Sequence, residues 1–157
     1  MMIRSVLLLA VFLILGLAAC SRSSDADAGV GSGRHHHDPP HGGTGVVLGD
    51  EEYHLEFVFD SAPGKIQAYI LSAHMETFVR VSAGSFVVIA KLPGGEEPLA
   101  FKGIASNATG ETIGDTSLFE AEADWLKTNK NFDALLKELT IKGRRYENVA
   151  FNLPKGN

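Results

Sequence analysis

The sequence predicts an all-β domain, specifically a sandwich of two sheets with about seven to nine strands. Apolar and polar residues alternate with a period of two in a series of short segments. Turns that contain glycine or proline separate these segments at regular intervals. A helix is favoured in one stretch, residues 123–131, and there only for one or two turns.

The first 19 residues have the pattern of a bacterial signal peptide, with Arg4 before an apolar run that is short for a membrane span. The sequence LAAC at residues 17–20 resembles the lipobox of bacterial lipoproteins, which implies cleavage before Cys20 and lipid attachment to its sulfur. Ser21 favours the outer membrane under the sorting rule of Gram-negative bacteria. We expect lipidated Cys20 to anchor the protein on the periplasmic side of the envelope. An ordinary secretory signal with a chance cysteine is the alternative.

Residues 20–40 are rich in serine, aspartate, glycine and proline, a composition that cannot bury enough apolar surface to fold. We expect a lipidated flexible tether there, followed by one β-sandwich domain at residues 41–157. Cys20 is the only cysteine, so this domain can have neither a disulfide nor a thiolate metal site. The net charge of −5 argues against binding to nucleic acid.

Residues 39–60, PPHGGTGVVLGDEEYHLEFVFD, predict the first β-hairpin, with a turn at residues 49–51. If Leu48 pairs with Tyr53, then Thr44, Val46 and Leu48 face the core together with the aromatic residues of the second strand. Because glycine lacks a side chain, we also expect open space above the opposite face. That opposite face would carry His41, Gly43, Gly45, Val47, His54, Glu56, Val58 and Asp60.

The rest of the chain predicts further strands and one ambiguous region. The leucines of residues 133–139 fit helical spacing, but the segments on either side of Lys142 and Gly143 read as a hairpin. We therefore expect a strand from about residue 135 onward. The other expected strands lie at residues 65–71, 77–81, 86–92, 99–105 and 117–122.

All six histidines lie between residues 35 and 74. Imidazole with a nearby carboxylate suits zinc or copper(II). The predicted ligands are His41, His54 and Glu56, with Asp60 as a further candidate and His35, His36 and His37 as weak ligands on the tether. In the alternative interpretation, His54 and Glu56 are solvated residues of an outer face. His74 lies in a predicted turn, where exposure to solvent is the simpler interpretation.

Motifs for catalysis are missing from the sequence. It contains no nucleophile elbow, phosphate-binding glycine loop, HExxH pair or calcium loop. We therefore expect neither an enzyme nor an organic cofactor.

The element PPHGG, the strand YHLEFVF and the following GKIQAYIL resemble the N-terminal domain of periplasmic adaptor subunits from heavy-metal efflux pumps of the resistance-nodulation-division class. Stand-alone lipoproteins with this opening, and with an ending like IKGRRYENVAFNLPKGN, are similar as well. The residues that match by motif are His41, Gly42, Gly43 and Glu56. The resemblance implies an immunoglobulin-like sandwich in the periplasm and a link to metal resistance.

Together these observations predict a lipid-anchored periplasmic module that binds a divalent transition metal. The resemblance adds an efflux or envelope protein as the expected partner. The alternative is a non-catalytic sandwich that binds other proteins of the cell envelope and has no role with metal.

Overall fold

The computed structural model describes residues 37–60 and 64–157. The predicted signal peptide, Cys20, His35 and His36 lie outside the described residues. Within the described ranges, no helix has the length and apolar character needed to cross a membrane.

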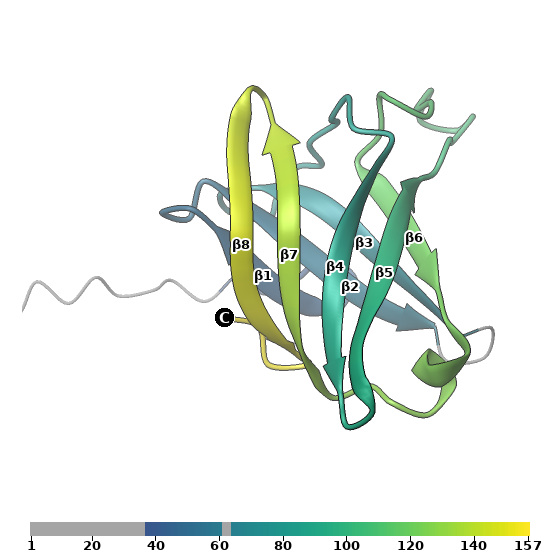
Figure 1. Ribbon diagram of the computed structural model, residues 1–157. Coiled ribbons are helices and arrows are strands. Elements are labelled where there is room, and N and C mark those ends of the chain that lie inside the picture. The colour runs from purple at the N-terminus through teal and green to yellow at the C-terminus, as the bar shows by residue number, and fades with distance from the viewer. Residues whose placement is uncertain (1–36, 61–63) are drawn as a thin grey trace, which may run out of the picture. The chain divides into compact units, whose positions relative to one another are not determined.

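The described chain folds into an all-β structure of eight antiparallel strands in one nearly closed, barrel-like sheet, with the order β1-β2-β3-β6-β5-β4-β7-β8. Figure 1 shows that the sheet has two facing walls. One wall consists of β8, β7, β4 and β5, and the other contains β1, β2 and β3. The strands are β1 (Thr44–Leu48), β2 (Tyr53–Asp60), β3 (Lys65–Ser72), β4 (Ser85–Leu92), β5 (Gly95–Gly103), β6 (Leu118–Glu122), β7 (Phe132–Ile141) and β8 (Arg144–Leu153).

The all-β class is confirmed, but the strands form one sheet where the sequence predicted two. The connection between the walls is a short pairing of β5 with β6, through Lys102 with Glu120 and Gly103 with Phe119. Because these pairs are antiparallel ladder contacts, hydrogen bonding continues from one wall into the other.

The first hairpin has the predicted register, with Leu48 opposite Tyr53. Its turn uses left-handed backbone at Gly49 (φ 65°) and Glu51 (φ 57°). The predicted core face is also confirmed, since Thr44, Val46, Leu48, Leu55 and Phe57 are all buried.

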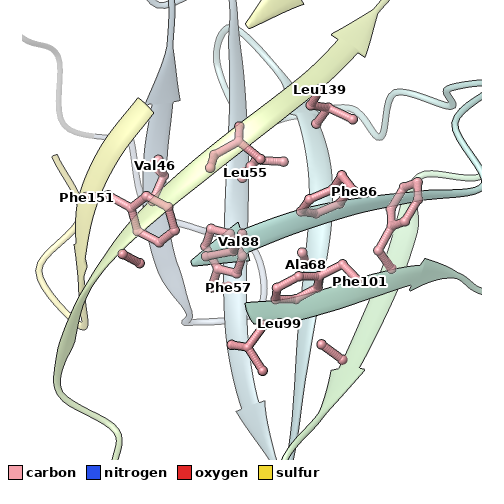
Figure 2. Close-up of a cluster of buried hydrophobic side chains, with 14 of the residues drawn as sticks. Val46, Leu55, Phe57, Ala68, Phe86, Val88, Leu99, Phe101, Leu139 and Phe151 are labelled. Carbon is pink, nitrogen blue, oxygen red and sulfur yellow. The ribbon is translucent and has the colours of Figure 1, made fainter. Parts of the chain in front are cut away.

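The core lies between the two walls and combines aliphatic side chains with a set of aromatic rings (Figure 2). Phe57 of β2 stacks on Phe151 of β8 with 5.0 Å between ring centres, and meets Phe101 of β5 edge-on at 5.5 Å. Phe86 of β4 stacks on Phe101 at 5.0 Å. Burial of each such side chain contributes about 1.5–3 kcal/mol. These contacts therefore hold strands from both walls together.

The ambiguous C-terminal region forms strands, as expected. β7 and β8 pair along their lengths. Lys142 (φ 48°) and Gly143 (φ 83°) are both left-handed in the turn between them, as a two-residue type I′ turn requires. The helical piece is a single 3₁₀ turn, Asp124–Lys127.

The strand expected at residues 77–81 is absent from the described structure. This segment makes isolated bridges from Phe78 to Leu71 and from Val81 to Thr116. Since Phe78 bridges to β3 while Val81 bridges to the residue stretch before β6, no single partner strand supports a continuous ladder.

Side chains close the seam between β1 and β8. At one end the amide of Asn157 bonds to both backbone groups of Val47, and Thr44 Oγ1 donates to Pro154 O at 3.2 Å. At the other end Glu52 pairs with Arg144 and accepts a 2.7 Å bond from the Tyr146 hydroxyl. Burial, aided by that bond to Glu52, raises the pKa of Tyr146 to about 12. Tyr146 therefore stays neutral and remains a donor at physiological pH.

Candidate functional site

Glu56 is the best-enclosed charged group of the predicted site. Its neighbours Leu55 and Phe57 point into the core, so strand alternation directs Glu56 to the outer face. The carboxylate is nevertheless fully buried, because residues 39–43, the covering segment, lie over it. Its Oε1 accepts bonds from the backbone N–H of His41 (2.8 Å) and Gly43 (2.9 Å), and its Oε2 lies 2.7 Å from His41 Nδ1. His41 and Glu56, which were predicted to bind one metal ion together, are thus joined directly by hydrogen bonds, here called the clamp.

Aromatic rings hold the His41 imidazole in place. It stacks on Tyr69 with 3.9 Å between ring centres and an interplanar angle of 16°. The ring centre of Phe78 lies 5.7 Å from that of His41 and 6.0 Å from that of Tyr69, and the Phe78 residue is 51% exposed. Burial raises the pKa of Tyr69, and the carboxylates of Glu56 and Glu120 add to this effect. The Tyr69 hydroxyl remains neutral and donates to Gln67 Oε1 at 2.9 Å.

The open space expected above Gly43 and Gly45 is filled by the protein itself. A side-chain carbon added at Gly45 would lie 3.6 Å from Met75 and 3.6 Å from Pro39. A carbon added at Gly43 would overlap the carbonyl oxygen of Phe57 and lie 2.8 Å from Val58 Cγ2. The glycines therefore allow the covering segment and Met75 to pack on the strands. Strand alternation could not indicate this, because the filling groups come from other parts of the chain.

His54 belongs to a different cluster on the same outer face. Its ring centre lies 5.7 Å from that of His37, which in turn lies 5.2 Å from that of His74. His54 is only 4% exposed, and its Nδ1 lies 3.3 Å from Ser72 O. Burial lowers the pKa of His54, the Ser72 carbonyl partly offsets this, and His37 and His74 lower it further. The neutral form of His54 is therefore favoured.

His74 is the member of this cluster that sequence reasoning missed. The register of β2 and β3 places Ser72 opposite Tyr53, so the turn that follows β3 begins beside His54. Met75, at φ 57°, is buried in this turn while His74 is exposed. The signal in the sequence was the position of His74 just after a strand that pairs with the strand of His54.

The structure separates Asp60 from the other predicted ligands. Asp60 ends β2 and pairs in register with Lys65. It lies six residues beyond His54, a separation of about 20 Å along an extended strand. Across the described ranges, no three histidine, cysteine, aspartate or glutamate side chains form a ready-made metal-binding group.

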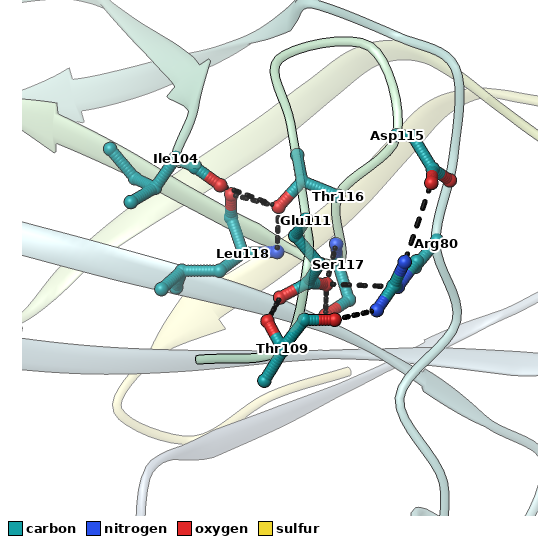
Figure 3. A network of polar contacts seen from close by, with 8 residues as sticks. All are labelled: Arg80, Ile104, Thr109, Glu111, Asp115, Thr116, Ser117 and Leu118. Atoms are coloured by element: carbon teal, nitrogen blue, oxygen red, sulfur yellow. Dashed lines mark hydrogen bonds and ion pairs between the residues drawn. The ribbon is translucent and has the colours of Figure 1, made fainter. Parts of the chain in front are cut away.

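A second buried carboxylate, Glu111, organises the loop before β6 (Figure 3). Its Oε1 accepts bonds from the Ser117 hydroxyl (2.6 Å) and backbone N–H (2.9 Å), and its Oε2 accepts one from Thr109 (2.7 Å). Arg80 Nε lies 3.7 Å from Oε1. Burial alone would raise the pKa of Glu111, but the bonds from Ser117 and Thr109 and the charge of Arg80 lower it overall. The carboxylate therefore serves as an anchor for the loop.

Comparison of the chain with protein-family models, with curated proteins and with solved structures gives no match. A functional assignment must therefore come from the residues themselves. Their main feature is that the histidines of the described ranges, namely His37, His41, His54 and His74, gather around the outer face of β2.

Proposed function

We propose that this protein is a non-catalytic envelope module that binds a divalent transition metal, zinc or copper(II), on the outer face of β2. The observation that carries the proposal is the convergence of histidines from the start of the domain, from β2 and from the turn after β3. Neutral imidazole is a common ligand for both metals. The buried position of His54 supports this role, because it favours the unprotonated ring that a metal requires.

The proposal includes anchoring by lipidated Cys20 on the periplasmic side of the envelope, with the outer membrane favoured, and a link to metal efflux. The resemblance to adaptor subunits rests on a Pro-His-Gly-Gly element and a strand glutamate. In this chain, His41, Gly43 and Glu56 form one hydrogen-bonded unit. A glutamate at this strand position is therefore physically tied to the His-Gly-Gly sequence before it.

The architecture proposed with this function remains an immunoglobulin-like sandwich. The two facing walls support it, since the described β5–β6 pairing that joins them consists of two residue pairs. Two walls joined by so short a pairing can pack face to face as the sheets of a sandwich do.

A second candidate function is a protein-interaction module without a metal role. It is favoured by Phe78, a large apolar side chain that is 51% exposed beside Tyr69 and His41. Exposed aromatic residues are enriched at protein interfaces. This second function would be favoured if the wild-type protein binds no metal but does bind an envelope partner, and if Phe78→Ser loses that partner.

Calorimetric titration of the untagged full chain with zinc and with copper(II) tests the metal proposal. The matched control is the double variant His35→Ala/His36→Ala, which removes two tether histidines outside the described residues. We expect one ion to bind with the same affinity in both proteins. Binding that disappears in the double variant would show that the tether alone holds the ion, and would overturn the proposed function.

A further inference from the structure

We propose that the ligands are the histidine trio of His37, His54 and His74, an inference that rests on the proposed metal-binding function. The ring centres are 5.7 Å apart for His37 and His54 and 5.2 Å apart for His37 and His74. With bonds from metal to nitrogen of about 2.0–2.1 Å and tetrahedral angles, two ligating rings have centres about 5 Å apart. The observed spacings are therefore close to those of rings that share an ion.

His54 is the fixed member of the trio. It is held within β2, is almost fully buried, and has Nδ1 3.3 Å from the Ser72 carbonyl oxygen. With the proton on Nδ1 donated to Ser72, Nε2 carries the lone pair that binds the metal. A carbonyl partner of this kind fixes the tautomer and orientation of a ligating histidine.

The other two members can adjust. His74 is exposed in the turn after β3, and His37 is half-buried before the covering segment. Since the described side chains do not form a ready-made metal group, binding requires rotation of these two rings so that their nitrogens converge. Exposed side chains make such changes of rotamer readily.

Glu56 and His41 have a different part in this site. Both Glu56 oxygens are engaged by His41 and Gly43, so using the carboxylate as a ligand would release the covering segment. While these bonds persist, they hold the chain a few residues after His37 against the sheet. Glu56 is therefore a positioning residue that keeps His37 near His54 and is not itself a ligand.

The chemistry of the trio indicates the class of ion and how it is used. Three imidazoles suit zinc or copper(II), whereas magnesium and calcium prefer oxygen ligands. Three protein ligands leave a fourth position for water or for a group from another molecule. An ion with an open position on an exposed face can pass to a partner, as a carrier in metal handling requires.

The test uses the untagged full chain with His35→Ala/His36→Ala as the background, so that tether histidines outside the described residues do not contribute. His74→Ala is the decisive variant, because His74 is exposed and its loss should leave the fold intact. Glu76→Ala, an exposed residue of the same turn, is the matched control. Zinc affinity is measured by competition with a chromophoric chelator, and the spectrum of bound cobalt(II) reports the geometry.

We expect His74→Ala to weaken zinc binding by roughly a hundredfold, given that even partners of ligands contribute 10–100-fold. It should also change the cobalt(II) spectrum, while Glu76→Ala leaves both unchanged. If His74→Ala binds zinc as tightly as the background protein, the trio is wrong, although the protein still binds metal. If the background protein binds no ion at all, the proposed function fails, and the trio with it.

Discussion

The side-chain amide of Asn157 pairs with both backbone polar groups of Val47. Its Oδ1 accepts from Val47 N at 2.8 Å, and its Nδ2 donates to Val47 O at 3.2 Å. A primary amide has one acceptor and a donor side by side, as a backbone neighbour would present them. Asn157 therefore takes the place of a paired strand residue at the seam between β1 and β8.

Replacing Asn157 with alanine should lower the free energy of unfolding by about 1 kcal/mol, the usual contribution of exchanged hydrogen bonds. Asn157→Asp should have a similar effect, because a carboxylate cannot donate to Val47 O. Urea unfolding monitored by Trp125 fluorescence measures both, with Lys155→Ala in the same tail as a control. Equal unfolding midpoints for all four proteins would mean that this pairing does not stabilise the seam.

Replacing Glu56 with alanine should loosen the covering segment. Alanine has no acceptor, so the backbone N–H groups of His41 and Gly43 both lose their partner, and so does the His41 ring. We expect a loss of about 1–3 kcal/mol and weaker zinc binding, since His37 is no longer held in place. Hydrogen exchange reports the cause directly, because the amides of His41 and Gly43 should lose protection. Unchanged protection, compared with the exposed control Glu76→Ala, would contradict the clamp.

Gly43→Ala should destabilise the first hairpin for a steric reason. The added carbon would overlap the Phe57 carbonyl oxygen and crowd Glu56 Cγ at 3.0 Å. Overpacking of this kind costs about 1–3 kcal/mol. Gly94→Ala is the control, since an added carbon there meets nothing within 4 Å. Thermal unfolding of the two variants should differ clearly, and similar melting temperatures would show that the chain relaxes around residue 43.

The free energy of unfolding should fall in acid, because the Glu111 carboxylate becomes protonated. Its pKa is lowered in the folded state, so the unfolded chain binds the proton more tightly. The contribution of Glu111 is therefore fully present above the unfolded pKa of 4.5 and is lost as pH falls through the lower folded value. Glu111→Gln should be less stable than wild type at pH 7, with the difference narrowing below pH 4.5. Urea midpoints across this range test it, with exposed Glu97→Gln as the control; a difference independent of pH would exclude this linkage.

Replacing Cys20 with serine should release the protein from the membrane fraction and block normal processing of the signal peptide. The reason is chemical, since the serine hydroxyl cannot replace the thiol that we propose as the site of lipid attachment. Fractionation of cells followed by immunoblotting measures the outcome. Pelleting of the variant with membranes to the wild-type extent would show that another feature holds the protein there.

Much of the fold could be predicted from local patterns. Alternation from Tyr53 to Asp60 and the turn before it were enough for the register of the first hairpin. The leucines of β7 fit a helix by spacing, but the hairpin pattern on either side of Lys142 and Gly143 correctly favoured a strand. In both cases the deciding residues are close together in the sequence.

The features that escaped prediction depend on contacts between distant segments. Alternation places Glu56 on the outer face, but it cannot show that residues 39–43 cover it. Likewise, the approach of His74 to His37 depends on how the turn after β3 lies against the start of the domain. Whether the walls form one sheet depends on the two residue pairs between β5 and β6, which no periodicity encodes.

The position of the Glu56 clamp also has a mechanical consequence. The chain before His37 joins the sheet through the covering segment. This segment is held on β2 by hydrogen bonds from the backbone of His41 and Gly43 to the Glu56 carboxylate. A pull along the chain from that side therefore loads these bonds before it reaches the ladder of β1 and β2. The hydrogen bonds of the clamp would therefore break before the pairing of β1 with β2, so the register of the first hairpin is protected.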